Sequence, residues 1–286
     1  METEIEIVRT FQFSSSAALR MMLGCSVWML GEVDAAPGLV DGAVALTREL
    51  GHKPSEAYAL AASLLFHHYR RDVARAYDTA NTLLTLAREE SFEIWSPFAL
   101  MFRGWATVER SRAGAGIAEL RRGIDLWQAT GNALNRTIAM TMLAECLWKD
   151  RQEDEALAIL TDEIPAATAR HEGHYLSEVY RVKAEILSQA RHRPDQAEPL
   201  LVQALELARA ASARMLELRT AVSLGHLWQQ TDRAAEVAGL VRPVLDGLPA
   251  GVTGHDVMAA RTLLDGVGGG PASASQRRSQ ATTWMA

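Results

Sequence analysis

The sequence repeats a pattern of small and aliphatic residues about every forty positions. One such residue leads each unit and another follows it twelve positions later, or thirteen in the fifth unit, and successive leading residues are 40, 40, 40, 40 and 41 positions apart. A fixed period of this length is typical of proteins built from stacked units, because one unit alone cannot bury its apolar face. The leading residues are Gly24, Leu64, Gly104, Ala144, Ala184 and Gly225, and their partners are Ala36, Ala76, Gly116, Ala156, Ala197 and Val237.

Each unit predicts two helices joined by a short polar turn. In the fourth unit, apolar residues follow helical spacing over 137–148, stop at the polar residues 149–151, and resume from Ala156. Asp150 is followed three positions later by Glu153, which predicts a capping box at the start of the second helix. The chain is therefore expected to form a series of helical hairpins.

The small residues predict where the two helices of a hairpin approach each other closely. Aliphatic residues four and eight positions after the second small residue are expected to fill the space between layers. Leu64 and Val237 break the small-residue rule, so we expect wider contacts there. Pro165 and Pro243 fall inside predicted second helices, where we expect a kink or an early end. The aliphatic positions are Val40, Ala80, Leu120, Leu160, Leu201 and Val241, then Val44, Leu84, Ile124, Ile164, Leu205 and Leu245.

The two ends of the chain differ from its middle. Residues 1–13 show no matching hairpin and are expected to be an irregular lead-in. The repeat domain covers 14–265 and ends in a final helix over about 256–265. Residues 266–286 are rich in Gly, Ser and Pro, which is typical of a disordered tail.

Composition and charge argue against several classes of partner. The chain has 29 basic and 35 acidic residues and a net charge of −6, which offers no basic footprint for nucleic acid or an anionic membrane. The acidic start lacks a signal-peptide core, and the longest apolar run, over 57–66, is too short to span a bilayer. The two cysteines lie far apart in sequence, which favours a reducing, cytoplasmic location.

The repeats resemble the tetratricopeptide pattern, with the usual period lengthened. Four stretches together look like the C-terminal helical-repeat region of large bacterial signalling ATPases, in which a class III nucleotide cyclase or a DNA-binding domain is joined to an ATPase and then to repeats. The stretches are 143–157 (LAECLWKDRQEDEAL), 178–187 (EVYRVKAEIL), 216–230 (LELRTAVSLGHLWQQ), and 104–106 (GWA) with 116–124 (GIAELRRGI).

This resemblance implies an all-α, right-handed tetratricopeptide-like superhelix, an α-solenoid of about six helical hairpins plus a C-terminal capping helix. It also implies a protein-interaction or ligand-sensing scaffold rather than an enzyme. The sequence contains no phosphate-binding loop and no pair of aspartates for a cyclase's metal ions. An alternative is the regulatory fragment of a nucleotide cyclase or signalling ATPase whose catalytic domains are absent, since the start falls part-way through the expected array.

In tetratricopeptide arrays the first helices line a concave face, so the resemblance also predicts a groove for a protein or peptide segment, possibly one of a signalling ATPase or cyclase. The residues expected to line this groove are aromatic in the N-terminal half of the chain and charged in the C-terminal half. The alternative is that the aromatic rings are packed between helices and the charged groups are solvated. The predicted groove residues are Trp28, Tyr69, Trp105, Glu145, Lys149, Arg181 and Glu185.

No metal or cofactor site is expected. The segment His171-Glu172-Gly173-His174 lacks the spacing of His-Glu-x-x-His, and its glycine favours a turn. No set of Ser, His and acidic residues with catalytic spacing is visible either.

Overall fold

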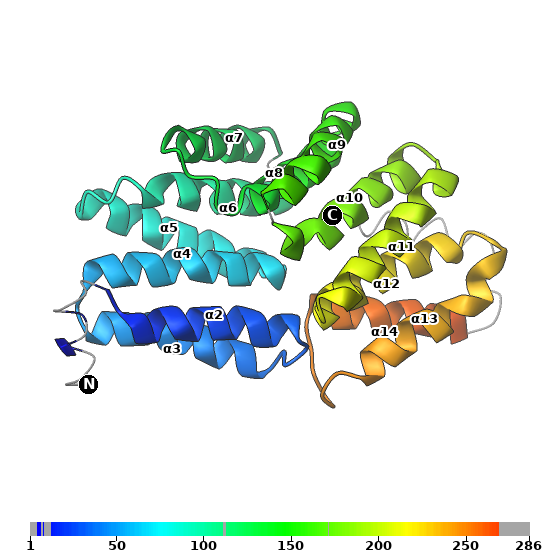
Figure 1. The fold of residues 1–286 in the computed structure, drawn as a ribbon, viewed down its shortest axis with the longest axis horizontal. Helices are drawn as coiled ribbons and strands as arrows, with labels where there is room; N and C mark the ends of the chain where they lie inside the picture. Colours follow the sequence, from blue (N-terminus) through cyan, green and yellow to red (C-terminus); the bar gives the residue numbers. More distant parts are fainter. Residues whose placement is uncertain (1–4, 7, 9–12, 111–112, 171, 269–286) are drawn as a thin grey trace. The chain divides into compact units, whose positions relative to one another are not determined.

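The computed structural model describes residues 5–6, 8, 13–110, 113–170 and 172–268, and all regular structure in this part of the chain is helical (Figure 1). None of these helices combines the length and the apolar character that a membrane crossing requires. The α-helices are α2 (Ser15–Met29), α3 (Ala35–Glu49), α4 (Lys53–Tyr69), α5 (Val73–Glu89), α6 (Trp95–Glu109), α7 (Ala113–Ala129), α8 (Arg136–Lys149), α9 (Glu153–Ala169), α10 (Leu176–Glu185), α11 (Pro194–Ala210), α12 (Arg214–Trp228), α13 (Val237–Asp246) and α14 (His255–Gly268). Three short elements join them: the 3₁₀ helices η1 (Gly173–Tyr175) and η3 (Asp232–Glu236), and the π-helix η2 (Ile186–Ala190).

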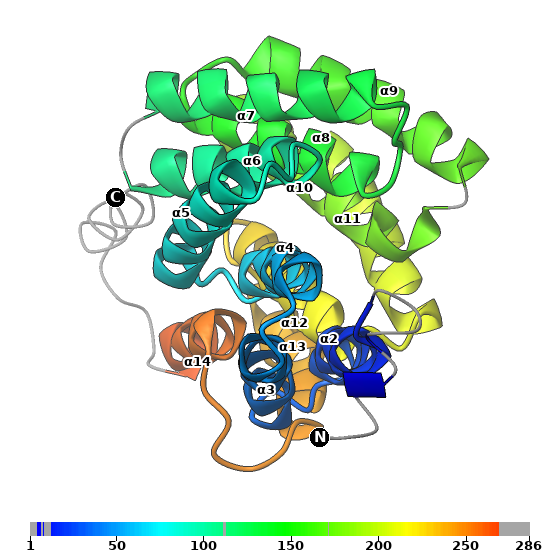
Figure 2. The ribbon, with the colours of Figure 1, turned by 90° about the vertical axis from the view of Figure 1, so that its left-hand side faces the viewer.

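The chain forms two compact units, residues 1–139 and 140–286, and the boundary falls inside α8. In unit 1 each helix from α2 to α7 packs against the next, and α4 also packs against α2 and α6 (Figures 1 and 2). In unit 2 the helices from α9 to α14 follow the same rule, and α12 also contacts α10 and α14. Packing between sequential neighbours confirms the predicted all-helical, solenoid-like fold.

The repeat positions found in the sequence form the contact between paired helices. All twelve leading and partner residues are buried. Gly104 and Gly116 show why small residues are needed: a Cβ on Gly104 would lie 2.6 Å from the backbone nitrogen of Leu120 and 2.7 Å from the carbonyl oxygen of Gly116. Val237, larger than the rule predicts, faces Gly225, where an added Cβ would lie 3.1 Å from Val237 Cγ1. The larger Val237 side chain on α13 thus packs against Gly225 on α12, which has no side chain.

Only some of the aliphatic residues expected to fill the space between layers are fully buried. The set that begins with Val40 is buried throughout, but in the second set Val44, Leu84, Ile164 and Leu245 are only half-buried. An α-helix turns about 100° per residue, so eight positions rotate a side chain about 80° from the contact line and seven positions only about 20°. The fully buried residues accordingly lie seven positions on: Ala43, Leu83, Gly123, Glu163, Ala204 and Val244.

Left-handed turn residues recur at multiples of the same forty-residue spacing as the helices. Gly31, Arg71 and Arg151 end first helices with positive φ values of 102°, 57° and 61°. After Arg71, the amide of Asp72 donates to the carbonyl of His67 and that of Arg71 to His68, and the pattern at Arg151 is the same. These are the paired hydrogen bonds of the Schellman motif, which satisfies the last carbonyls of a helix.

One local prediction at a helix end was wrong. The N-cap of α9 is Gln152 rather than Asp150, and it makes no side-chain capping hydrogen bond. Asp150 cannot cap, because the left-handed Arg151 separates it from the helix; it accepts a hydrogen bond from Gln152 Nε2 instead. At Pro165 and Pro243 a kink or an early end was expected; neither helix ends at its proline, since α9 continues to Ala169 and α13 to Asp246.

The single step of 41 residues coincides with the π-helix η2. The leading residue Ala184 keeps the forty-residue step, but its partner Ala197 comes one position late, so the extra residue lies between them. The left-handed turn residues agree, because His192 follows Arg151 by 41 positions. Within this interval the amide of Arg191 donates to the carbonyl of Ile186, five residues back. A π-turn holds one more residue than an α-turn, so it absorbs the insertion without rotating the residues that follow.

Deleting Ser188 should therefore be tolerated. The deletion restores a forty-residue unit and an α-helical turn, so we expect a thermal midpoint within about 4 °C of wild type, equivalent to about 1 kcal/mol. Deleting Thr107 is the matched control, because it is another half-buried hydroxyl residue near the end of a first helix. That deletion rotates the end of α6 by about 100° and should abolish cooperative unfolding by circular dichroism. If both deletions lowered the thermal midpoint equally, the inserted residue would not lie in the π-helix η2.

The predicted ends lie largely outside the described residues. Of the lead-in, only 5, 6, 8 and 13 are described, and 5, 6 and 8 are helical. The predicted final helix is present as α14, but it continues to Gly268, so the first three residues of the predicted tail are helical. Residues 269–286, the rest of that tail, lie outside the described part.

Candidate functional site: a buried charge row in unit 2

The three aromatic residues of the predicted groove lie in the interior of unit 1. Trp28 on α2 stacks on Tyr69 of α4, with ring centroids 6.1 Å apart and planes 10° apart. Trp105 on α6 meets His68 of α4 edge to face at 4.7 Å. All three predicted aromatic residues are buried, which is the packing alternative that the sequence left open. The rings hold neighbouring first helices together and, as placed, present no surface to a partner.

The polar groups around these rings are not poised for chemistry. Burial lowers the pKa of His67 to about 4, so its imidazole is neutral at pH 7. Within the described residues, neither His67 Nδ1 nor Trp105 Nε1 has a hydrogen-bond partner. Burial also raises the pKa of the Cys25 thiol to about 11, which leaves almost no thiolate to act as a nucleophile.

In unit 2, three predicted groove residues come together around one guanidinium group. Arg181 of α10 donates from Nη2 to Glu145 Oε1 of α8 at 3.2 Å, and its Nη1 lies 2.8 Å from Glu185 Oε2. Arg181 also binds Glu178 in a bidentate manner, at 2.8 and 3.0 Å. Lys149, the fourth predicted charged residue, is exposed at the end of α8.

The ionic contacts continue onto the next two first helices. Arg219 of α12 donates to Glu178 Oε2 at 2.9 Å and to both oxygens of Asp256, at the start of α14, at 2.9 and 2.8 Å. Ser223 of α12 donates to Glu185 Oε1 at 2.6 Å. We call this set the charge row: Glu145, Glu178, Arg181, Glu185, Arg219, Ser223 and Asp256.

Sequence reasoning missed Glu178, Arg219, Ser223 and Asp256. The period contained a signal for Arg219, which follows Glu178 by 41 positions and so occupies the same place on the next first helix. Asp256 was interpreted only as the beginning of the final helix. No pattern in the sequence indicated that these groups would be buried together.

The charged side chains of the charge row are paired with one another. Burial opposes the charge of Arg181, but the carboxylates of Glu178, Glu185 and Glu145 hold its pKa well above the ordinary value. Burial would likewise raise the pKa of Asp256, yet the charge and hydrogen bonds of Arg219 lower it well below its usual range. All three nitrogens of each guanidinium already donate to carboxylates, so neither arginine is available to an anionic ligand.

The accessible edge of the charge row is acidic. The Glu185 side chain keeps 19% of its surface exposed, whereas Glu178 has none. His226 on α12 is half-buried and electrostatically coupled to Glu185, and burial lowers its pKa. This edge therefore offers a carboxylate beside a neutral imidazole, a setting suited to a basic or hydrogen-bond-donating group.

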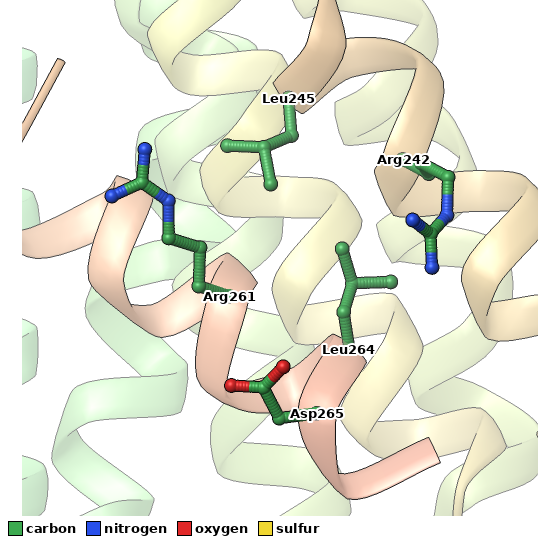
Figure 3. Close-up of a pocket in the computed structure, with 5 residues that line it drawn as sticks. All are labelled: Arg242, Leu245, Arg261, Leu264 and Asp265. Atoms are coloured by element: carbon green, nitrogen blue, oxygen red, sulfur yellow. The ribbon is translucent and has the colours of Figure 1, made fainter. Parts of the chain in front are cut away.

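A pocket lies between α13 and α14 in unit 2. Its volume is about 410 Å³. Figure 3 shows Leu245 and Leu264 between the guanidinium groups of Arg242 and Arg261. Arg261 is held by a hydrogen bond from Nη2 to the carbonyl of Val252 at 3.1 Å. The lining side chains are two guanidinium groups, two leucines and the carboxyl group of Asp265.

In the part of the chain that the structure describes, no cluster of three or more His, Cys, Asp or Glu side chains is arranged to hold a metal ion. His171 lies outside that part.

Comparison with known proteins gives one distant relative. No protein-family model matches the chain. An uncharacterized protein of Rhizobium meliloti (strain 1021) is 24% identical over 205 residues, which are 72% of this chain and 20% of the relative. The chain thus spans about a fifth of the length of the relative that it matches.

Proposed function

We propose that the chain is a non-catalytic, cytoplasmic binding scaffold that docks a partner segment on its first helices, as in tetratricopeptide arrays. In this proposal the helices group into six hairpins and a capping helix in a right-handed superhelix. The observation that carries the proposal is the charge row: ionisable residues from α8, α10, α12 and α14 meet inside unit 2, and Glu185 gives this row an accessible edge. Cys25 and the α13–α14 pocket, which offer no activated nucleophile, support a non-catalytic role.

The accessible edge of the charge row indicates the chemistry of the segment. Arg181 and Arg219 are fully engaged, so the partner contacts the carboxylate of Glu185 rather than either guanidinium group. A lysine or arginine in the segment would make a charge-assisted hydrogen bond there, and such bonds are about twice as strong as neutral ones. Exposed Lys149, on the neighbouring first helix α8, would favour an acidic residue elsewhere in the same segment.

Peptides selected from a random library on the full chain provide the test. We expect selected peptides to carry a basic residue, to bind more weakly at high salt, and to lose about tenfold in affinity to the Glu185→Gln variant. Glu206→Gln on α11 is the matched control, an exposed second-helix carboxylate whose loss should change affinity less than about twofold. Fluorescence anisotropy measures the affinities. If selected peptides bind the Glu185→Gln variant as tightly as wild type, they do not bind at the accessible edge of the charge row.

A second candidate function is the regulatory part of a nucleotide cyclase or signalling ATPase. The observation that favours it is the length of the Rhizobium meliloti relative, of which the matched residues are only a fifth. A phosphate-loop ATPase or cyclase encoded beside this chain should then change its turnover when the purified chain is added. Turnover that stays constant up to saturating amounts of the chain would exclude this function.

A further inference from the structure

The pocket between α13 and α14 combines positive charge with apolar surface. Leu245 of α13 and Leu264 of α14 are half-buried, and they lie between the guanidinium groups of Arg242 and Arg261 (Figure 3). The fifth lining residue, Asp265, belongs to α14, one turn after Arg261. Two cationic groups against one anionic group leave the lining with a surplus of one positive charge.

The repeat explains why this side of α14 is polar and open. Asp265 follows the leading residue Gly225 by forty positions, so it occupies the leading position of a seventh first helix. In the six units the leading residue is small or aliphatic and buried, because a second helix packs against it, as Gly116 does against Gly104. Asp265 is charged and exposed, and so is Arg261 one turn before it. This side of α14 is therefore not shaped to receive another tightly packed helix, and its charged groups stay available to a ligand.

Arg261 is held in place by the connection between the two helices. This connection, residues 247–254, contains no helical turn, and its Val252 is buried. Arg261 Nη2 donates to the carbonyl of Val252 at 3.1 Å, the one hydrogen bond that this side chain makes among the described residues. A guanidinium group has five N–H donors, so the remaining donors of Arg261 are free. A group that is positioned before a ligand arrives loses less entropy on binding.

Arg242 keeps all its donors free in the part of the chain that the structure describes. It forms no hydrogen bond or ion pair there, not even with Asp246, one turn further along α13 and outside the pocket lining. Other arginines of unit 2, such as Arg181, Arg219 and Arg233, pair with carboxylates. A planar guanidinium group presents two parallel N–H bonds that match the two oxygens of an anion. Arg242 is therefore the anion-binding group of the pocket.

Charge, apolar surface and size together define the class of ligand. A surplus of one positive charge matches a monoanion, and a carboxylate fits this better than a phosphate monoester, which carries nearly two negative charges at pH 7. The half-buried Leu245 and Leu264 require an apolar body beside the anionic group. The volume of about 410 Å³ lies within the range of small-molecule sites. Asp265 repels an anion, which directs the carboxylate to Arg242.

We propose that the α13–α14 pocket binds a small monocarboxylate with an apolar body. The carboxylate accepts hydrogen bonds from Arg242, and the body packs against Leu245 and Leu264. This site is separate from the accessible edge of the charge row, so it stands or falls independently of the binding of a partner segment there.

Octanoate is the probe for this site, added to the full chain with its leucine methyl groups labelled for NMR. We expect a Kd on the order of 1 mM, usual for a ligand of this size, with shifts of the Leu245 and Leu264 methyl signals. Octylamine and octanol, which have the same body without the negative charge, should bind at least about tenfold more weakly. Shortening the acid should weaken binding by about fourfold for each CH₂ group removed.

Two variants with opposite expected effects test the roles of the residues. Arg242→Gln should weaken octanoate binding at least about tenfold, and Arg122→Gln, an exposed arginine of α7, is the matched control with less than about a twofold change. Asp265→Asn should tighten binding about twofold, because it removes a repelling charge, and a loss of fold cannot produce such a gain. Octylamine that binds as tightly as octanoate, or leucine signals that stay unchanged at about 20 mM octanoate, would overturn the proposal.

Discussion

Replacing Gly104 with alanine is expected to lower the free energy of unfolding by about 3 kcal/mol, the upper end of the usual cost of overpacking. The added Cβ would lie 2.6 Å from the nitrogen and 2.9 Å from the Cα of Leu120, and 2.7 Å from the carbonyl oxygen of Gly116. All three atoms belong to the backbone of α7, so no side chain can rotate away. The two helices must separate, and the contacts of buried Trp105 and Leu120 loosen with them.

Gly114→Ala is the control for this prediction. Gly114 lies in α7, in the same helix pair, and an added Cβ there would have no atom within 4 Å. Alanine stabilises an open helical position by about 0.5–1 kcal/mol relative to glycine, so the sign of the effect should reverse. Urea unfolding followed by circular dichroism measures both variants. A Gly104→Ala variant as stable as wild type would show that α6 and α7 do not approach as closely as the structure places them.

Replacing Arg219 with methionine should lower the free energy of unfolding by about 3–5 kcal/mol. The substitution keeps most of the apolar stem but leaves the buried carboxylates of Glu178 and Asp256 without their shared donor, and an uncompensated buried charge is strongly destabilising. Arg209→Met is the control, because it breaks the Arg209–Glu217 pair in which the arginine side chain is 52% exposed. Pairs of that kind contribute about 0–1 kcal/mol. Equal losses in the two variants would contradict a buried charge row.

The same variant should change how stability depends on pH. Arg219 holds the pKa of Asp256 below its unfolded value of about 3.9, so the stabilisation is complete above that pH and is lost as the pH falls toward the folded pKa. Wild type should therefore lose stability steeply below about pH 4, and Arg219→Met should flatten this loss. Urea unfolding at several pH values between about 3 and 7 measures both slopes. An unchanged acid slope in the variant would assign the loss to other carboxylates.

Much of the fold could be predicted because the contacts between paired helices depend on residue size at fixed intervals. Gly104 and Gly116 are recognisable in the sequence, since only small residues allow two backbones to touch, and the period then locates their equivalents. The position at which α9 begins after Asp150 could not be predicted from residue size and spacing. The left-handed conformation of Arg151 displaced the helix start by two residues, and a non-glycine residue gives no local signal for that conformation.

The candidate site was less predictable, because its burial depends on packing between successive helical hairpins within unit 2. Glu145, Arg181 and Glu185 were identified from their places on first helices, and the structure brings them together. Trp28, Tyr69 and Trp105 occupy similar places, and they too are buried, because large rings gain more from packing between helices than from exposure. Asp256 belongs to the charge row through a contact with a residue 37 positions away, which periodicity did not indicate.

We propose that a partner segment binds at the accessible edge of the charge row, and photo-cross-linking would locate the bound segment. A library-selected peptide carrying one photoreactive residue would be cross-linked to the full chain, and the modified residues identified by mass spectrometry. We expect cross-links on α10 and α12 beside Glu185 and His226, and we expect these cross-links to be lost in the Glu185→Gln variant. Cross-links confined to the second helices α9, α11 and α13 would contradict it.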